Sequence, residues 1–560
     1  MIEIILFFIT YVVLFFSVIG YGLIMARFSK LTPTNDINIG IKVILGIIFL
    51  SFVSYITIFF ISHNIFFNSL IHLIGIFFFF KNFNKFKEFK NLSNIIIILS
   101  LFIGLIISKT HDDFSFYHLQ QSLNFSQNKF QIGLSNLDFS YSHHSSLLYL
   151  NSIFYLPFYK FLLFNIPNQI IFTGAILAFY NFSKDTQNEN FLRYYSIISL
   201  IYIIIKFTRL AEFGTDTSGQ LLILLFFYFI FKFFLVKNLQ QKKEIIILTG
   251  FFLIYCITLK TYFILYILVF LYIAFSYNIL KFFRIFLKSF FITAFSFLFL
   301  ISFFLLNLFT SGCIIYPFPF LCFESLTWAL PVSEVEDYQI WYEAWAKSLA
   351  GAGYATEGYK EILGSFSWIN IWYKNYFFGR FSENIILLTF IHSIFLYIFK
   401  GKKIIKKLNL KLFLSIYSFI LFIAFVWFFK HPALRYGGYA PIFLIFSLPT
   451  SFYLSKFTFT EIKFSKYTNI LLIIAVLFFM SKNLVRINSE ILRNDVYKFS
   501  NFPFFSVPIV NYQKINLTDE IFVFKPLKNN CWSTPAPCPY SEGLSAKKKM
   551  GFIIFYKDKR

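Results

Sequence analysis

Two adjacent carboxylates stand at the end of a long apolar run. Residues 94–107, NIIIILSLFIGLII, lead almost directly into Asp112 and Asp113 in SKTHDDFSFYHLQ, residues 108–120. Ionised side chains beside hydrocarbon are costly, so their placement usually serves a function. One carboxylate could take a proton from a hydroxyl as a general base, while the other binds a divalent ion that neutralises a phosphate leaving group. The structural alternative is a solvated helix terminus, where Asp is common.

Histidines gather in the same segment. His111, His118, His143 and His144 are four of the eight in the chain. A neutral imidazole can donate, accept or ligate a metal, so His111 joins the two carboxylates as a candidate ligand set for Mg²⁺ or Mn²⁺. A helix that begins after YSHHSS would also offer free N–H groups to a phosphate or carboxylate. For any single histidine, the alternative is a polar residue at the membrane interface.

A second acidic segment is RLAEFGTDTSGQ, residues 209–220. Glu212 and Asp216 are four residues apart, and Arg209 precedes them as a candidate phosphate-binding cation. If this segment faces the first across a cavity, the two would complete a metal or base site. Asp216 could instead cap the helix that follows.

Two cationic side chains lie at the outward ends of predicted spans, on the same face as the acidic segments. Lys260 lies in CITLKTYFIL and Arg435 in HPALRYGGYAPIF. A fixed guanidinium can bind phosphate oxygens through two parallel hydrogen bonds. The neighbouring His431, Tyr436 and the glycine pair 437–438 favour a shaped phosphate or lipid-donor site at Arg435. The alternative, strongest for Lys260, is a side chain that snorkels to the headgroups.

The elements that must position these residues are membrane-spanning helices. The chain has 560 residues, of which 58% are hydrophobic, and a mean hydropathy of +0.69. Repeated apolar stretches of the length that crosses hydrocarbon predict an all-α polytopic membrane protein with about fourteen transmembrane helices. The first apolar stretch is too long for a signal peptide and is expected to be the first span.

Basic connectors set the expected orientation, because cytoplasmic loops are enriched in Lys and Arg. They also account for the net charge of +24, so nucleic-acid binding is not implied. The opposite, outward face then receives the candidate site segments, a long aromatic and acidic loop, and both termini. The connectors placed in the cytoplasm are 26–30, 81–90, 183–193, 236–243, 281–288, 400–407 and 456–466.

Cysteine spacing agrees with that orientation. Cys313 and Cys322 share one outward loop, and Cys531 and Cys538 share another. Close pairs in loops predict two disulfides on an oxidising face, although four free thiols are the alternative. Cys256 lies in an apolar run and is expected to be buried.

These assignments divide the chain into six segments. Residues 145–182 are expected to hold an interfacial helix and only one span, because the flanking loops fix the parity. After the last span, short strand patterns around CWSTPAPCPY predict a small outward α/β appendage. The segments are 1–108 (N-terminal helices), 109–165 (the His-Asp-Asp loop), 166–309 (helices), 310–383 (the aromatic acidic loop), 384–485 (C-terminal helices) and 486–560 (the tail).

Taken together, the acidic pair in the first large outward loop, the TSGCIIYP loop entry and the ALRYGGYAP motif resemble the GT-C-type glycosyltransferases, in an uncharacterised bacterial branch. That resemblance implies a fold of many helices and sugar transfer from polyprenyl-phosphate carriers on the non-cytoplasmic face. It also implies that Asp112 or Asp113 acts as the base and that Arg435 binds the lipid phosphate.

The resemblance therefore implies an enzyme of the bacterial inner membrane whose site faces the periplasm. Its expected reaction is inverting transfer of a sugar from a polyprenyl-phosphate-linked donor to a glycan, lipid or protein acceptor. The competing interpretations are a transporter or flippase for a lipid-linked or anionic envelope substrate, an O-antigen polymerase or ligase-like enzyme, and an assembly protein. The aromatic loop suits either sugar binding or a membrane-interface belt.

Overall fold

The structure is a computed structural model of the whole chain. It describes residues 2–31, 37–83, 91–108, 113–209, 215–287, 290–348, 363–403, 409–493, 501–528 and 530–557.

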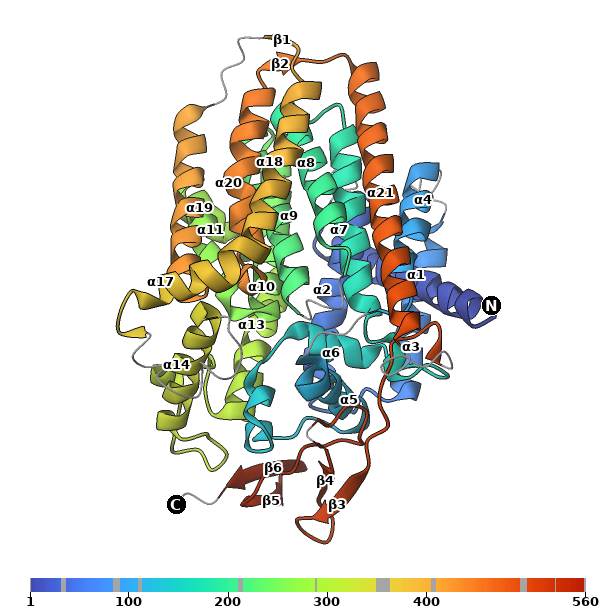
Figure 1. Cartoon of the computed structure of the whole chain (residues 1–560), viewed down its shortest axis with the longest axis vertical. Coiled ribbons are helices and arrows are strands. Elements are labelled where there is room, and N and C mark those ends of the chain that lie inside the picture. Colours follow the sequence, from blue (N-terminus) through green and yellow to red (C-terminus); the bar gives the residue numbers. More distant parts are fainter. Residues whose placement is uncertain are drawn as a thin grey trace.

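Long apolar helices form a bundle in which most axes run roughly along the long axis of the molecule, while α1 lies across it (Figure 1). The most buried of them pack at its centre, where nearly every side chain of α7 and α9 is inaccessible to solvent. The helices of the bundle are α1 (Ile2–Phe28), α2 (Ile39–Thr57), α3 (Ile65–Lys81), α4 (Leu92–Leu101), α7 (Ile166–Lys184), α8 (Asn190–Lys206), α9 (Asp216–Leu235), α10 (Leu239–Leu259), α11 (Ile267–Ser276), α12 (Ile279–Leu287), α13 (Phe290–Ser311), α18 (Ser382–Ile398), α19 (Leu410–Lys430), α20 (Tyr439–Leu454) and α21 (Glu461–Leu492).

The protein is a multi-pass membrane protein, but fourteen spans are not supported. Among the described residues, eight helices are long and apolar enough to cross a membrane, or nine if α11 and α12, bent by 108° at their junction, form one broken span. The eight begin at Ile2, Ile39, Phe161, Asp216, Phe290, Ser367, Leu410 and Glu461.

The missing spans have a physical explanation in helix length and charge. α3 and α8 each have 17 residues and α20 has 16. At 1.5 Å per residue they reach about 25 Å, less than the roughly 30 Å of hydrocarbon. α10 is longer, but its first turns carry Lys242, Lys243 and Glu244. Apolar runs of similar composition therefore form helices of different lengths, and the shorter ones do not cross the hydrocarbon.

Three of the basic connectors, 183–193, 400–403 and 456–466, meet at one end of the bundle. Arg193 pairs with Glu461 at 2.7 Å, and Lys184 donates to the carbonyl of Ser465. The two-residue strands β1 (Lys402–Lys403) and β2 (Phe457–Thr458) pair there as well, at the top of Figure 1. These three connectors are therefore on one side of the molecule, as predicted, while the side of the membrane that they face stays a prediction.

The other end carries a compact cap built from loops, short helices and the tail. It contains α5 (Leu119–Gln127), α6 (Ser146–Ile153) and α14 (Val332–Ser348), while α17 (Ser367–Trp372) opens the candidate span that continues into α18. α6 is buried along its whole length, so it is a core element of the cap rather than an interfacial helix. As expected, residues 161–184 then supply a single span.

The tail forms two β-hairpins beneath the bundle (Figure 1). Its described residues after α21 hold no α-helix, so the expected α/β appendage is a β appendage. β6 continues into the cap through a bridge between Ile554 and Ile132. The antiparallel pairs are β3 (Tyr512–Asn516) with β4 (Phe522–Pro526), and β5 (Leu544–Lys549) with β6 (Phe552–Lys557).

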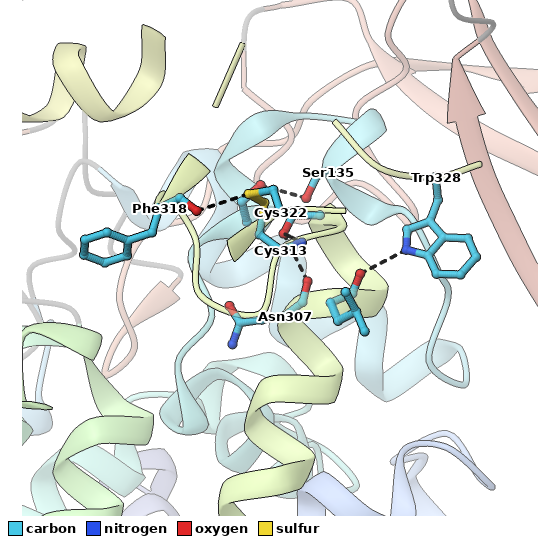
Figure 2. Close-up of a disulfide and its surroundings, with 9 residues drawn as sticks. Ser135, Asn307, Cys313, Phe318, Cys322 and Trp328 are labelled. Carbon is cyan, nitrogen blue, oxygen red and sulfur yellow. Dashed lines mark hydrogen bonds between the residues drawn. A yellow bond between two sulfur atoms is a disulfide. The ribbon is translucent and has the colours of Figure 1, made fainter. Parts of the chain in front are cut away.

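Both predicted disulfides are present, and both lie in the cap. Cys313 bonds Cys322, and Cys531 bonds Cys538, while Cys256 is free and buried. Figure 2 shows the first disulfide just beyond the end of α13, where the indole of Trp328 donates to the carbonyl of Leu308 at 2.9 Å. The disulfide and this hydrogen bond fold the loop back onto the helix that carries it.

A thiol count tests this arrangement. The unfolded protein without reductant should react at one thiol, Cys256, because the other four sulfurs are bonded. With reductant all five cysteines should react. The measurement is mass spectrometry after alkylation in denaturant, with Cys256→Ser as the control that should show no reactive thiol before reduction. Three or five reactive thiols without reductant would contradict the pairing.

Candidate functional site

Asp113 begins a turn that the tail holds in place. It precedes the π-helical turn η5 (Phe114–His118), which continues directly into α5. The backbone N–H of Trp532 donates to the carbonyl of Ser115, and the side chain of Asn530 donates to the Ser115 hydroxyl at 3.0 Å. The disulfide-closed loop of the tail therefore contacts the turn that carries the carboxylate.

Arg435 lies in a short 3₁₀ turn, η13 (Leu434–Tyr436), between α19 and α20. The amide of Gln220 on α9 donates to the carbonyl of Arg435 at 3.0 Å and accepts from the N–H of Ala440 at 3.2 Å. Gly437 follows with φ +101°, and a Cβ there would lie 2.6 Å from the ring of Tyr262. Both the backbone angle and the close ring require glycine.

The fold brings Asp113 and Arg435 together, although 322 positions separate them (435 − 113). The guanidinium lies 3.7 Å from the carboxylate, which is an ion pair but longer than a hydrogen bond. Arg435 also donates to the hydroxyl of Tyr436 at 2.7 Å and lies 4.7 Å from the centre of that ring. The arginine is thus held by Tyr436 as well as by its carboxylate partner.

A second ion pair lies against the first. Lys260, just after α10, bonds the carboxylate of Asp216 at the start of α9. Its ammonium group lies 4.6 Å from the centre of the same Tyr436 ring. Tyr436 therefore contacts a cation from each pair, and cation–ring attraction stabilises both positions. We call Asp113, Asp216, Lys260, Arg435 and Tyr436 the charged cluster.

Solvent exposure separates the two carboxylates. The side chain of Asp113 is 37% exposed and that of Asp216 is 11% exposed. Arg435 and Lys260 are 23% and 28% exposed. Asp113 and both cations are therefore accessible to a ligand, whereas Asp216 mainly holds Lys260.

The charged cluster and its buried surroundings shift the pKa values of two neighbouring side chains, Tyr117 and His143. Burial raises the pKa of Tyr117 well above its ordinary value, and the negative charges of Asp113 and Asp216 raise it further. Burial lowers the pKa of His143 to about 4, against the opposing effect of the same two carboxylates. Both side chains are therefore neutral near pH 7, and they enclose the cluster without adding charge.

The cap extends this enclosure with aromatic side chains. His143 bonds the hydroxyl of Tyr342 on α14 at 2.7 Å, and its ring lies 5.8 Å from that of Tyr117. His144 is buried and makes a different set of contacts, to the hydroxyls of Thr310 and Tyr149. His143 thus borders the cluster, while His144 joins the cap to α13.

The remaining predicted site residues lie at its edge or outside it. The ring of His431 is 6.4 Å from that of Tyr436, and burial lowers the pKa of His431 to about 4. Arg209 is exposed just beyond the end of α8. His111, Asp112 and Glu212 fall outside the described residues, so their predicted roles stay predictions.

A metal site is not assembled from the residues that the structure describes, which hold no group of three His, Cys, Asp or Glu side chains suited to a metal ion. Two members of the proposed ligand set, His111 and Asp112, lie outside that part of the chain. The expectation of Mg²⁺ or Mn²⁺ therefore stays a prediction.

Sequence reasoning missed three residues that shape the site: Tyr117, Gln220 and Tyr342. Tyr117 and Gln220 could have been found, because each stands four residues after a candidate carboxylate, a spacing that places side chains on one helix face. Tyr342 offered no such signal, because its contact with His143 joins parts of the chain 199 residues apart.

The buried His144 predicts a pH dependence of stability. Burial lowers its pKa to about 3, so between pH 6.5 and that value the unfolded chain binds a proton that the folded chain does not. Acidification from pH 7 to 4 should therefore remove up to about 3 kcal/mol of stability through this residue. His144→Gln should unfold with a smaller pH dependence, measured by tryptophan fluorescence during thermal unfolding in detergent. An unchanged pH dependence in the variant would contradict this role.

Comparison with known proteins identifies the family of the chain but gives no function for it. Comparisons with curated proteins and with solved structures give no match. A family model described as a domain of unknown function, DUF8201, matches residues 4–442. That range contains the whole charged cluster and ends before the tail. Because the match spans most of the chain, the protein belongs to the DUF8201 family.

Proposed function

We propose that the protein transfers a sugar from a polyprenyl-phosphate carrier to a hydroxyl acceptor, on the side of the membrane that faces the disulfide-bonded cap. The observation that carries the proposal is the pairing of an accessible carboxylate, Asp113, with a fixed guanidinium, Arg435, at 3.7 Å. Because both members of this ion pair are partly exposed, a phosphate can replace the carboxylate on the guanidinium and leave Asp113 to face the acceptor.

The two cations are assigned to the phosphate. Arg435 and Lys260 both contact the ring of Tyr436, so a phosphate near that ring can interact with two positive charges. Such fixed cations stabilise the charge that develops on a leaving phosphate. In the reaction, the bond between the anomeric carbon and the phosphate oxygen breaks, and the polyprenyl phosphate departs as an anion.

Asp113 is assigned as the general base. It is the more exposed of the two carboxylates in the charged cluster, at 37% against 11% for Asp216. The acceptor hydroxyl gives its proton to Asp113 as its oxygen bonds to the anomeric carbon. Attack on the face opposite the phosphate inverts the configuration at that carbon.

The position of the charged cluster suits a donor anchored in lipid. The turn that follows Asp113 carries Phe116, which is 54% exposed, and the cluster stands at the ends of apolar helices. A polyprenyl tail could remain in hydrocarbon while its phosphate reaches Arg435. This is why carboxylates and cations would be placed at the membrane boundary despite their desolvation cost.

The charge distribution in the central helices supports an enzyme over a transporter. The charged residues of α9 are Asp216 and Lys232, near its opposite ends, and those of α8 are Arg193 and Lys206, also near its ends. A charged substrate crossing the membrane would be expected to meet polar or ionised groups along the whole depth.

Two substitutions should separate the proposed roles. Asp113→Asn should lower sugar transfer by at least about 100-fold, because it removes the base, while the carrier still binds. Arg435→Gln should weaken binding of polyprenyl phosphate by about tenfold or more, because a charge-assisted contact is lost. The measurements are mass spectrometry of lipid-linked and envelope-bound sugars in expressing cells, and native mass spectrometry of purified protein with polyprenyl phosphate.

Asp519→Asn is the matched control, because Asp519 is exposed on the tail far along the chain from the cluster. It should behave as wild type in both measurements. Unaltered sugar distribution in cells expressing Asp113→Asn, together with unaltered carrier binding by Arg435→Gln, would overturn the proposal.

A further inference from the structure

An apolar cavity lies at the basic end of the bundle, opposite the charged cluster. Its volume is about 330 Å³, within the size range of small-molecule sites. The ends of α8, α9, α19 and α20 border it together with α11. Most of its described wall is aromatic, formed by Phe191, Phe231, Phe234, Tyr272, Phe413 and Phe452.

The polar residues of the wall are at the start of α19. Lys411 and Asn409 line the cavity and both are exposed. The side-chain oxygen of Asn409 accepts from the N–H of Leu412, which fixes the first turn of α19. A second cation, Lys456, lies 4.9 Å from the centre of the Phe452 ring. Among the described wall residues there is no carboxylate.

The cavity also lies at a particular depth. α9 ends at Leu235 and α19 begins at Leu410, and both helices are long and apolar enough to cross a membrane. Helix ends of this kind lie where hydrocarbon meets the headgroups. An apolar space with a cationic rim at that level matches a lipid, whose phosphate and acyl chains meet at the same boundary.

We propose that this cavity binds one acyl chain of an anionic glycerophospholipid, with the headgroup phosphate against Lys411. Burial of methylene groups among the aromatic rings supplies the attraction for the chain. The lysines supply the preference for a net negative headgroup, because each basic residue near a membrane surface favours anionic lipid. The site is separate from the charged cluster and does not depend on the proposed transferase activity.

Native mass spectrometry of delipidated protein in detergent tests this site. The probes are phosphatidylglycerol and phosphatidylcholine with identical acyl chains. The first phosphatidylglycerol should bind about fivefold or more tightly than the first phosphatidylcholine, because only the former carries a net negative charge. Equal binding of the two lipids would overturn the assignment of the headgroup.

Two pairs of variants locate the site. Leu412→Trp should fill the cavity and lower the affinity for the first phosphatidylglycerol by about tenfold. Leu414→Trp, at a position 53% exposed on the same helix, should leave that affinity unchanged. Lys411→Gln should reduce the preference for phosphatidylglycerol, while Lys463→Gln, an exposed lysine on α21, should not. If Leu412→Trp binds as tightly as wild type, the lipid lies elsewhere and the proposal fails.

Discussion

The cost of holding charge at a membrane boundary is the constraint on which the rest of the structure depends. Each charged side chain near hydrocarbon needs a partner, and here two carboxylates and two cations supply one another. Tyr436 stands between the cations, within 4.7 Å of the Arg435 guanidinium and 4.6 Å of the Lys260 ammonium. Each carboxylate offsets part of the cost of holding a cation in this partly buried position.

Much of the architecture can be understood as support for that cluster. Its members come from four parts of the chain: the turn before α5, the start of α9, the residue after α10, and the turn between α19 and α20. Gln220 ties the last of these to α9, and the tail binds the first through Ser115. The family match ends at residue 442, so one of these supports, the tail, lies outside the shared region.

The sequence was sufficient for the membrane class and both disulfides, because hydropathy and cysteine spacing are local signals. It also identified Asp113, Asp216, Lys260, Arg435 and Tyr436 as candidates, since charged residues beside apolar runs are conspicuous. It could not show which carboxylate bonds which cation. That depends on packing between helices more than 40 positions apart, as for Lys260 and Asp216.

The number of membrane spans and the position of α6 in the cap were harder to predict from the sequence. Apolar composition alone does not set helix length, so α3, α8 and α20 were expected to span and are shorter than the hydrocarbon. α6 was expected at the interface, but it is buried by contacts from both flanking helices and the cap. The apolar cavity at the basic end gave no local signal, because its wall residues also suit an ordinary core.

The most direct test of the central claim is an experimental structure of the protein with polyprenyl phosphate in a lipid nanodisc. The account predicts phosphate density in contact with both the Arg435 guanidinium and the Lys260 ammonium, with the Asp113 carboxylate moved away from Arg435. Phosphate density at any other place, with the Asp113–Arg435 pair unchanged, would contradict the assignment of the charged cluster as the carrier site.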